Sequence, residues 1–328
     1  MSSSTSSRPF PFLRTLLQLR GGARLCVLVY HRLRDPIDAL DTWNPDAGVF
    51  ERHVETLAAC FTPLGLAEAV ERMATNSLPP RAVAVTFDDG YRDNVDAVLP
   101  ILKRHGVPAT FFISTGYLDG GRMWNDTVVE AVRATAAPAL DLAHWGLPAF
   151  PLSTVDERRN AILAITAALK YEPPPLRQAR VAELAERAGR PLPASPMLRS
   201  EDVRTLRGAG MDIGAHTISH PILARIDPAA AREEIEGSRE QLRSLLREPV
   251  TLFAYPNGRP VRDYGPEHVR MAKEAGFRAA WSTAPGLASA TSDLHQIPRV
   301  TPWQREPARF AWGLGRLFLG RPRAYARA

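Results

Sequence analysis

The sequence contains little lysine and little cysteine. Its 328 residues include three lysines, Lys103, Lys170 and Lys273, so the formal net charge of +6 depends almost entirely on arginine. The arginines are scattered among acidic residues, and no focused basic stripe or nucleic-acid-binding module is evident. We therefore interpret the charge as a solvated surface and expect no nucleic-acid partner.

The two cysteines are Cys26, in an apolar run, and Cys60, in an amphipathic helical pattern. We expect both to be small buried core residues, because nothing in their spacing indicates a disulfide or a metal pair.

The sequence also lacks a long hydrophobic run. The first strongly apolar stretch, Leu25–Tyr30, is far too short to cross a membrane. Residues 1–22 are Ser-rich and then mildly amphipathic, without the apolar core and cleavage site of a secretory signal. We expect a cytoplasmic protein with no transmembrane segment and with a flexible N-terminal segment over residues 1–22.

Short apolar runs alternate with amphipathic helical patterns through most of the chain. The apolar runs are 25–31, 82–89, 109–115, 211–216, 250–256, 277–283 and 295–300, and the helical patterns are 50–61, 93–106, 200–210, 227–246 and 265–276. Continuous apolar runs are typical of parallel strands buried on both faces. This alternation predicts an α/β fold over residues 23–302, an incomplete (β/α) barrel of about seven parallel strands, with an open doubly wound sheet as the alternative. Residues 124–199 interrupt the alternation and predict a helical insertion over one mouth of the barrel.

Polar residues directly follow four of the predicted strands. They are His31, Asp88, Asp89, His216, His220 and the segment Tyr255–Gly258. In a parallel barrel the carboxyl ends of the strands carry the active site, so we expect these residues to lie together.

The residue types indicate metal chemistry at this edge. Adjacent carboxylates such as Asp88 and Asp89 repel each other unless a cation lies beside them, although a capping role in a loop is the simpler alternative. His216 and His220 are four residues apart, so one helical turn would put both imidazoles on one side. Two histidines and a carboxylate suit zinc or another divalent metal. One aspartate would bind the metal and the other would accept a proton from water, as in metal-assisted hydrolysis of an acyl group.

The segments TFDDG, HTISH and FAYPNG together resemble the polysaccharide deacetylase (NodB homology) family. Its members remove N- or O-acetyl groups from carbohydrates on an incomplete (β/α) barrel. The resemblance extends over about Leu25–Val300, and the segments VLVYHRL and IPRV resemble a branch associated with exopolysaccharide and cell-envelope glycan synthesis.

The resemblance implies a role for each residue that matches a motif. Asp88 would be the general base, and Asp89, His216 and His220 would hold one divalent ion, most simply zinc. A backbone N–H near Asn257 would help to hold the oxyanion, and Tyr255 belongs to the same segment. The implied substrate is an acetylated carbohydrate, either a polysaccharide or a glycan precursor.

The sequence departs from the family pattern at two positions. Many members carry, at the position of Ala254, an arginine that steadies the catalytic aspartate, and Arg259 or Arg299 could replace it here. Many members also carry a late histidine as general acid. His295 is late but its context matches poorly, so we prefer His31, at the expected mouth of the barrel.

Three further questions stay open at the sequence level. Trp281 could line the acetyl pocket or simply pack in the core. A deacetylase or deformylase of a lipid-linked sugar and a catalytically inactive carbohydrate-binding protein are alternative functions. The basic aromatic tail 303–328 predicts either peripheral contact with an anionic membrane or a final helix packed on the barrel.

Overall fold

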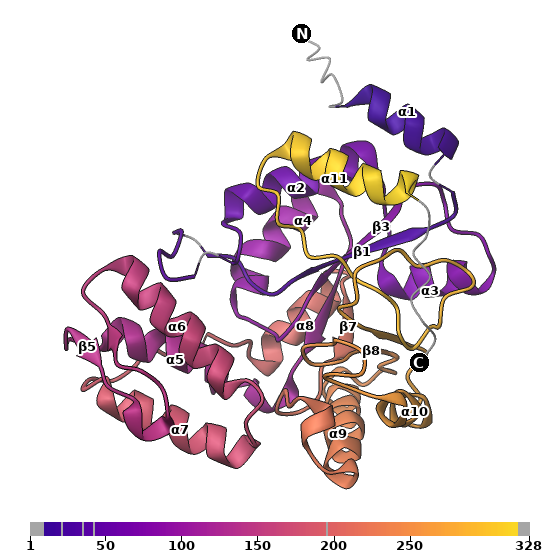
Figure 1. The fold of residues 1–328 in the computed structure, drawn as a ribbon. Coiled ribbons are helices and arrows are strands. Elements are labelled where there is room, and N and C mark those ends of the chain that lie inside the picture. The colour runs from indigo at the N-terminus through magenta and orange to yellow at the C-terminus, as the bar shows by residue number, and fades with distance from the viewer. Residues whose placement is uncertain (1–9, 21, 35, 42, 195, 321–328) are drawn as a thin grey trace.

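The computed structural model describes residues 10–320 apart from residues 21, 35, 42 and 195. A seven-stranded sheet forms its centre, in the order β1-β3-β4-β7-β8-β9 with β2 beside β3, and every neighbouring pair is parallel (Figure 1). The strands are β1 (Leu25–Tyr30), β2 (Thr62–Pro63), β3 (Ala82–Phe87), β4 (Ala109–Ile113), β7 (Asp212–Ala215), β8 (Leu252–Ala254) and β9 (Ala279–Trp281). The predicted α/β class with a parallel, incomplete barrel is confirmed.

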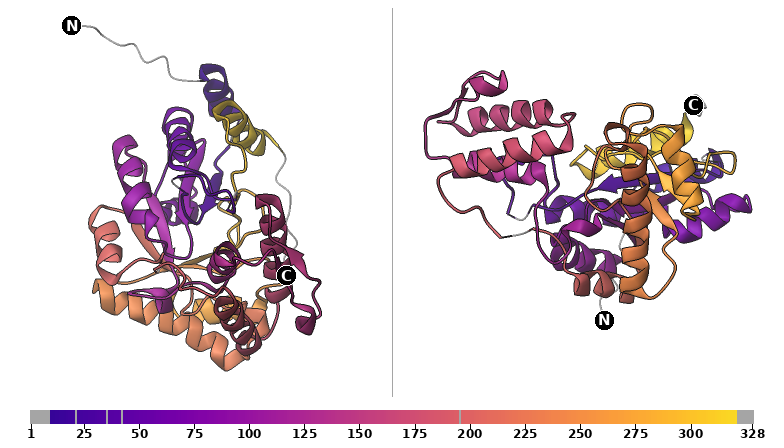
Figure 2. Two further views of the ribbon diagram at one scale, coloured as in Figure 1. Left: turned by 90° about the vertical axis from the view of Figure 1, so that its left-hand side faces the viewer. Right: turned by 90° about the horizontal axis from the view of Figure 1, so that it is seen from below.

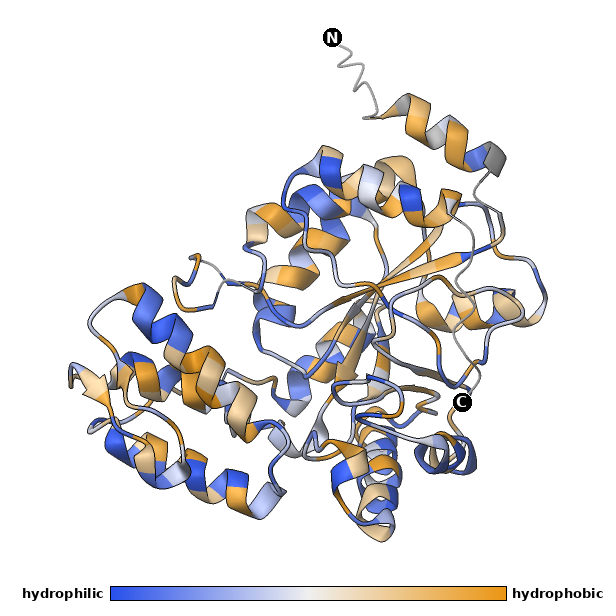
Figure 3. Cartoon of the chain, viewed as in Figure 1, coloured by the Kyte–Doolittle hydropathy of each residue, from blue (hydrophilic) through white to orange (hydrophobic). Residues whose placement is uncertain are grey.

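The apolar runs form strands because both faces of the sheet are covered. Every residue of β1, β3 and β4 is buried, and Figure 3 shows these strands as hydrophobic. Successive side chains alternate between two cores. Val27, Phe112 and Trp281 belong to the cluster inside the curved sheet, whereas Leu28 and Phe111 pack beneath the outer helices.

The predicted seventh strand, 295–300, does not form a regular strand. It makes single bridges from Ile297 to Trp281 and from Val300 to Leu28, so it lies between β9 and β1. Backbone hydrogen bonds join Ile297 to Ala280 and Val300 to Val27. Pro298 has no N–H to donate, which prevents a continuous ladder. This closing segment bridges the two edges of the sheet.

Five helices cover the outer face of the sheet. They are α2 (Ala47–Cys60), α4 (Leu99–His105), α8 (Ser200–Gly208), α9 (Pro228–Leu246) and α10 (Pro266–Glu274). The helix α3 (Leu66–Ala74) instead packs against the cluster inside the curved sheet. Asp46 and Asp227 cap α2 and α9 through their carboxylates, and Gly106 ends α4 in the left-handed conformation. All five predicted helical patterns form helices, although 93–106 begins as a wider turn over Asn94–Val98, and α3 was not predicted.

The insertion forms a separate group of helices beside the barrel, as Figures 1 and 2 show. It contains α5 (Trp124–Ala134), α6 (Val155–Leu169), α7 (Pro174–Arg187) and a small antiparallel pair, β5 (Ala139–Leu140) and β6 (Phe150–Pro151). These elements bury a hydrophobic cluster of their own. The predicted helices are present, whereas the strand pair was not foreseen.

We expected residues 1–22 to be flexible, but part of this segment is a packed helix. Residues Pro11–Arg20 form α1, which packs against α11 (Pro307–Leu319) and α2. Leu13 and Leu17 are fully buried, and a Cβ at Gly315 would lie 2.7 Å from the Leu13 side chain. The amphipathic pattern therefore reflects packing between the two ends of the chain. Residues 1–9 lie outside the described part.

The C-terminal helix α11 accounts for the apolar stripe of the tail. Phe310, Leu314 and Phe318 are buried, and the His53 ring stacks on Phe310 with 4.0 Å between ring centroids. This packing explains the stripe without a membrane, and membrane contact stays a prediction. Arg321 and Arg323, which belong to the basic tail, lie outside the described residues. No helix in the described part of the chain is long and apolar enough to span a bilayer. Cys26 and Cys60 are buried free thiols, as predicted.

Candidate active site

The loops at the carboxyl ends of the strands contain unusual backbone conformations. Non-glycine residues with positive φ angles there include Asp89 (78°), Thr217 (65°), His220 (54°) and Asn257 (60°). Such conformations cost free energy for residues with a side chain, and they cluster where function requires a fixed geometry. Asp89 is followed by Gly90 at φ 90°, so the chain turns sharply between two strand ends.

Hydrogen bonding fixes the orientation of the His216 ring. Its Nδ1 lies 2.7 Å from the carbonyl oxygen of Ala254, the last residue of β8. A carbonyl only accepts, so Nδ1 carries the proton and the lone pair is on Nε2. Burial lowers the pKa of His216 to about 4, which keeps the ring neutral at ordinary pH.

Asp89, His216 and His220 form a group that could hold a metal ion. Oδ1 of Asp89 lies 3.6 Å from Nε2 of His216 and 3.4 Å from Nε2 of His220. The same Oδ1 is buried and has no hydrogen-bond partner in the described chain. Burial and the charge of Asp88 raise the pKa of Asp89 well above its usual value, and burial lowers that of His220. An orphaned carboxylate oxygen facing two neutral imidazoles fits a divalent cation.

The HTISH loop brings its two histidines together without the helical turn that their spacing suggested. Thr217 and His220 are left-handed, and the segment is irregular. The Thr217 hydroxyl accepts a hydrogen bond from the His220 N–H at 3.1 Å, which helps to fix the loop. The carboxylate of Glu234 on α9 accepts from the N–H groups of Ile218 and Ser219, both at 2.8 Å. Sequence reasoning missed Glu234, which lies 14 residues beyond the motif in an ordinary amphipathic helix.

Asp88 is held by an arginine from the closing segment. Nη1 and Nη2 of Arg299 donate to the two carboxylate oxygens of Asp88 at 2.7 and 2.8 Å. Arg299 also donates to the Ser282 carbonyl and to the Thr86 hydroxyl. Both charged side chains are buried. A bidentate pair of this kind is strong because it satisfies both partners in a fixed geometry.

Arg299 therefore makes the contact with Asp88 that an arginine at the position of Ala254 was expected to make. Arg259, the other candidate, is exposed and makes no hydrogen bond or ion pair with Asp88 among the described residues. Burial alone would raise the pKa of Asp88, but the positive charge of Arg299 and its hydrogen bonds to the carboxylate outweigh burial and lower the pKa to about 2. Oδ2 of Asp88 also lies 3.9 Å from Nε2 of His216, so it borders the candidate metal site.

His31 lies exposed at the same end of the sheet, directly after β1. The buried side-chain amide of Asn94 donates to the His31 carbonyl at 3.1 Å, and the carboxylate of Asp93 accepts from the Leu33 N–H at 3.2 Å. Asp93 and Asn94 come just after the TFDDG segment, so the chain that follows TFDDG holds the loop that contains His31. Desolvation lowers the pKa of the His31 imidazole, and the charge of Asp88 opposes that shift.

Three other residues singled out in the sequence make no hydrogen bond to Asp88 or His216 in the described part of the chain. Nε2 of His295 lies 2.9 Å from the carbonyl of Phe277, just before β9 and hence at the opposite end of that strand. The Tyr255 ring is fully buried against Tyr264, and its N–H donates to the Trp281 carbonyl. Trp281 is fully buried against Phe112, which fits its core-packing reading.

The backbone N–H of Asn257 is the free donor in this region. It makes no hydrogen bond within residues 10–320 as far as these are described, whereas its carbonyl accepts from the Thr283 hydroxyl. Gly258 follows at φ 70°, and a Cβ there would lie 3.0 Å from the Thr283 nitrogen. The turn is thus held tightly with one N–H left over.

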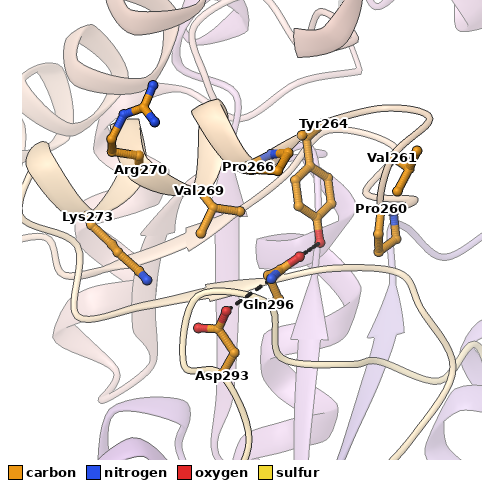
Figure 4. A pocket seen from close by; sticks show the side chains of 10 residues that line it. Pro260, Val261, Tyr264, Pro266, Val269, Arg270, Lys273, Asp293 and Gln296 are labelled. Carbon is orange, nitrogen blue, oxygen red and sulfur yellow. Dashed lines mark hydrogen bonds between the residues drawn. The ribbon is translucent and has the colours of Figure 1, made fainter. Parts of the chain in front are cut away.

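A cavity of about 320 Å³ lies behind this turn, between α10 and residues 293–296. Figure 4 shows the Tyr264 hydroxyl and Asp293 both hydrogen-bonded to Gln296 across it. None of the candidate metal ligands lines this cavity, so it is separate from the site.

Comparison with known proteins places this geometry in a family. The family model for polysaccharide deacetylase matches residues 75–144 and 153–280, which is more than half of the chain. The chain belongs to the polysaccharide deacetylase family. The matched residues include Asp88, Asp89, His216 and His220, but they stop short of Arg299 and begin after His31.

Individual relatives are distant. YxkH of Bacillus subtilis (strain 168) is 21% identical over 280 residues, covering 85% of this chain and 71% of that protein. The structure of IcaB from Ammonifex degensii aligns with a TM-score of 0.58 at 18% identity, covering 91% of this chain and 98% of that one. Streptococcus pyogenes deacetylase PplD in complex with acetate aligns with a TM-score of 0.56 at 18% identity, covering 85% and 92%. At these identities the structures show a shared fold.

We predict that His216→Ala abolishes stoichiometric binding of a divalent metal, because it removes one of three converging ligand atoms. His295→Ala removes an imidazole that lies before β9 and should bind metal as the wild type does. Metal analysis of both variants after dialysis in metal-free buffer checks this. Undiminished metal in the His216 variant would show that the ion is held elsewhere.

We predict that Arg299→Gln moves the acidic limb of the pH–kcat/KM profile to higher pH. The reason is that losing the positive charge raises the pKa of Asp88 from about 2. It should also cost about 3–5 kcal/mol of stability, as for other broken buried pairs. Arg299→Lys keeps the charge and should restore part of both. Arg259→Gln is the control, and a shifted limb in that variant alone would contradict the assignment.

Proposed function

We propose that the protein is a metal-dependent deacetylase that hydrolyses the N-acetyl or O-acetyl group of a carbohydrate, a polysaccharide or glycan precursor. The observation that carries this proposal is the pairing of two environments at one turn. Asp89 faces two imidazoles with an oxygen that lacks a partner, and the adjacent Asp88 is ionised by Arg299. Membership of the family supports the same reaction.

A divalent ion held by Asp89, His216 and His220, most simply zinc, would polarise the acyl carbonyl and lower the pKa of a water molecule. Asp88 stays ionised over a wide pH range, so its carboxylate can accept the proton of the attacking water. The free N–H of Asn257 donates to the oxygen that becomes negative in the tetrahedral transition state. His31, exposed at the same end, donates a proton to the leaving amine or alcohol.

An N-acetylated hexosamine in a glycan precursor is our first choice of substrate, and the shared fold of the Streptococcus pyogenes deacetylase PplD supports it. A deacetylase or deformylase of a lipid-linked sugar is the second candidate. It would agree with the expected cytoplasmic location and with the exposed Phe12, Trp303 and Trp312 beside the arginines of the tail. A non-catalytic carbohydrate-binding protein is disfavoured because the candidate metal ligands and Asp88 are all present.

Acetate or formate release tests the proposal directly. A panel of polymeric, nucleotide-linked and lipid-linked acylated sugars is incubated with the protein, with and without a chelator. We expect release from at least one acetylated sugar, its loss with chelator and its recovery when zinc is restored. Release that survives complete metal removal would contradict the mechanism.

We predict that Asp88→Asn lowers kcat by about 10²–10⁴-fold, the usual contribution of a general base, because an amide cannot accept the proton. The variant should keep its metal, since Asp88 is not one of the three converging ligands. Asp96→Asn, an exposed aspartate nearby in the sequence, is the matched control. Near-full turnover in the Asp88 variant would place the base elsewhere.

We predict that His31→Ala slows hydrolysis of an acetamido sugar much more than that of an activated acetyl ester. An amine leaves only with a proton, whereas an activated alcohol leaves without one. His295→Ala should affect both substrates equally and weakly, because His295 is hydrogen-bonded before β9. Steady-state kcat values for the two substrates give the comparison, and the reverse ranking would assign the acid to His295.

A further inference from the structure

Three cationic side chains converge on one tyrosine where the insertion meets the mouth of the barrel. The guanidinium carbons of Arg262 and Arg225 lie 4.3 and 5.5 Å from the centroid of the Tyr171 ring, and Nζ of Lys170 lies 5.7 Å from it. Lys170 and Tyr171 join α6 to α7 in the insertion. We call Lys170, Arg225 and Arg262 the Tyr171 cluster.

The Tyr171 cluster is attached to the two loops that carry the site. Arg225 lies five residues after His220, and Arg262 lies five residues after Asn257. The Ala224 N–H donates to the Asp263 carbonyl at 3.0 Å, so these loops are joined. The Tyr171 cluster is therefore held on the same pair of loops as His220 and Asn257.

Within the described chain, no cation of the Tyr171 cluster has a carboxylate within 4.0 Å. Other arginines of the same insertion are paired, as Arg180 is with Glu172 and Arg187 is with Glu183. Asp263 is nearby, but it is fully buried and accepts from the Tyr171 hydroxyl at 3.2 Å and from the Arg259 N–H at 3.0 Å. One carboxylate thus faces several positive charges.

A fourth cation, Arg177 on α7, lies beside the Tyr171 cluster. Its side chain is only 8% exposed, donates to the Lys170 carbonyl at 3.3 Å and lies 5.0 Å from the Trp124 ring centroid. It has no carboxylate in ion-pair range among the residues described. A cation this deeply buried is costly without an anion, so the arrangement is incomplete as a purely structural one.

We propose that the substrate carries an oxyanion group, a phosphate or a carboxylate, which binds to Arg177 and the Tyr171 cluster while its acyl group lies at Asp88 and Asp89. This inference rests on the proposed function and narrows the substrate to anionic glycans, such as a sugar phosphate or a uronic-acid-containing oligosaccharide. Guanidinium groups recognise both oxyanions through paired N–H donors. Cation–π contact with Tyr171 holds the guanidinium groups in place and leaves their N–H edges available.

Binding measurements test this without requiring turnover. The metal-loaded protein is titrated calorimetrically with a neutral amino sugar, with the same sugar carrying a phosphate, and with an oligosaccharide that carries a uronate. We expect the wild type to bind an anionic ligand about 10- to 100-fold more tightly than the neutral one, as one or two charge-assisted hydrogen bonds provide. The difference should shrink at high salt.

The double variant Arg225→Gln/Arg262→Gln should bring the ratio of neutral to anionic Kd close to one. Both side chains are exposed, so the fold should tolerate the change, and thermal unfolding checks it. The matched control, Arg243→Gln/Arg278→Gln, removes the same charge from exposed positions outside the site and should keep the wild-type ratio.

The outcomes separate the two proposals. Equal Kd values for neutral and anionic ligands in the wild type, or an unchanged ratio in the double variant, would overturn the anionic subsite. Preference for phosphate over uronate, or the reverse, identifies the oxyanion. Charge-dependent binding without acyl release from any anionic sugar would keep the subsite and overturn the deacetylase proposal instead.

Discussion

The ion pair between Arg299 and Asp88 is the interaction on which the candidate site depends. It joins the end of β3 to the closing segment, and both partners are buried. Without Arg299, two adjacent buried carboxylates would face each other with no fixed positive charge in contact, and protonation of one or both would follow. With Arg299 in place, Asp88 is ionised at any ordinary pH. Burial and the charge of Asp88 then raise the pKa of the adjacent Asp89.

Asp88 and Asp89 are both aspartates, but their surroundings give them different properties. Asp88 has both oxygens in hydrogen bonds and a pKa of about 2, whereas Asp89 has an orphaned oxygen and a raised pKa. Arg299 neutralises the charge of Asp88, whereas Asp89 has no cation in contact among the described residues. Asp89 is therefore suited to share a divalent ion with the imidazoles of His216 and His220. The left-handed backbone at Asp89 makes this possible, because it turns consecutive side chains toward one region.

The sequence was sufficient for the fold and for the local motifs, and insufficient for contacts made across the barrel. Buried parallel strands and capped helices have local signatures, so β1, β3, β4 and α9 could be predicted from apolar runs and from Asp227. The partner of Asp88 could not, because Arg299 lies 211 residues away and reaches it only through closure of the sheet. Spacing was likewise misleading for His216 and His220, whose loop is shaped by Glu234 and by two left-handed residues rather than by a helical turn. His295 illustrates the same difficulty, since proximity in sequence to a strand does not determine which end of the barrel a side chain occupies.

The closing segment is also the last part of the barrel to be synthesised. Residues 295–300 bridge β9 to β1, so the edge of β1 is covered only after the end of the domain has been synthesised. Until then the carboxylate of Asp88 has no guanidinium partner, and the edge of β1 exposes unpaired backbone groups. Order of synthesis, sheet closure and ionisation of Asp88 are thereby coupled. A nascent chain contains every candidate metal ligand well before it contains Arg299, and completion of the barrel supplies the cation that keeps Asp88 ionised once it is buried.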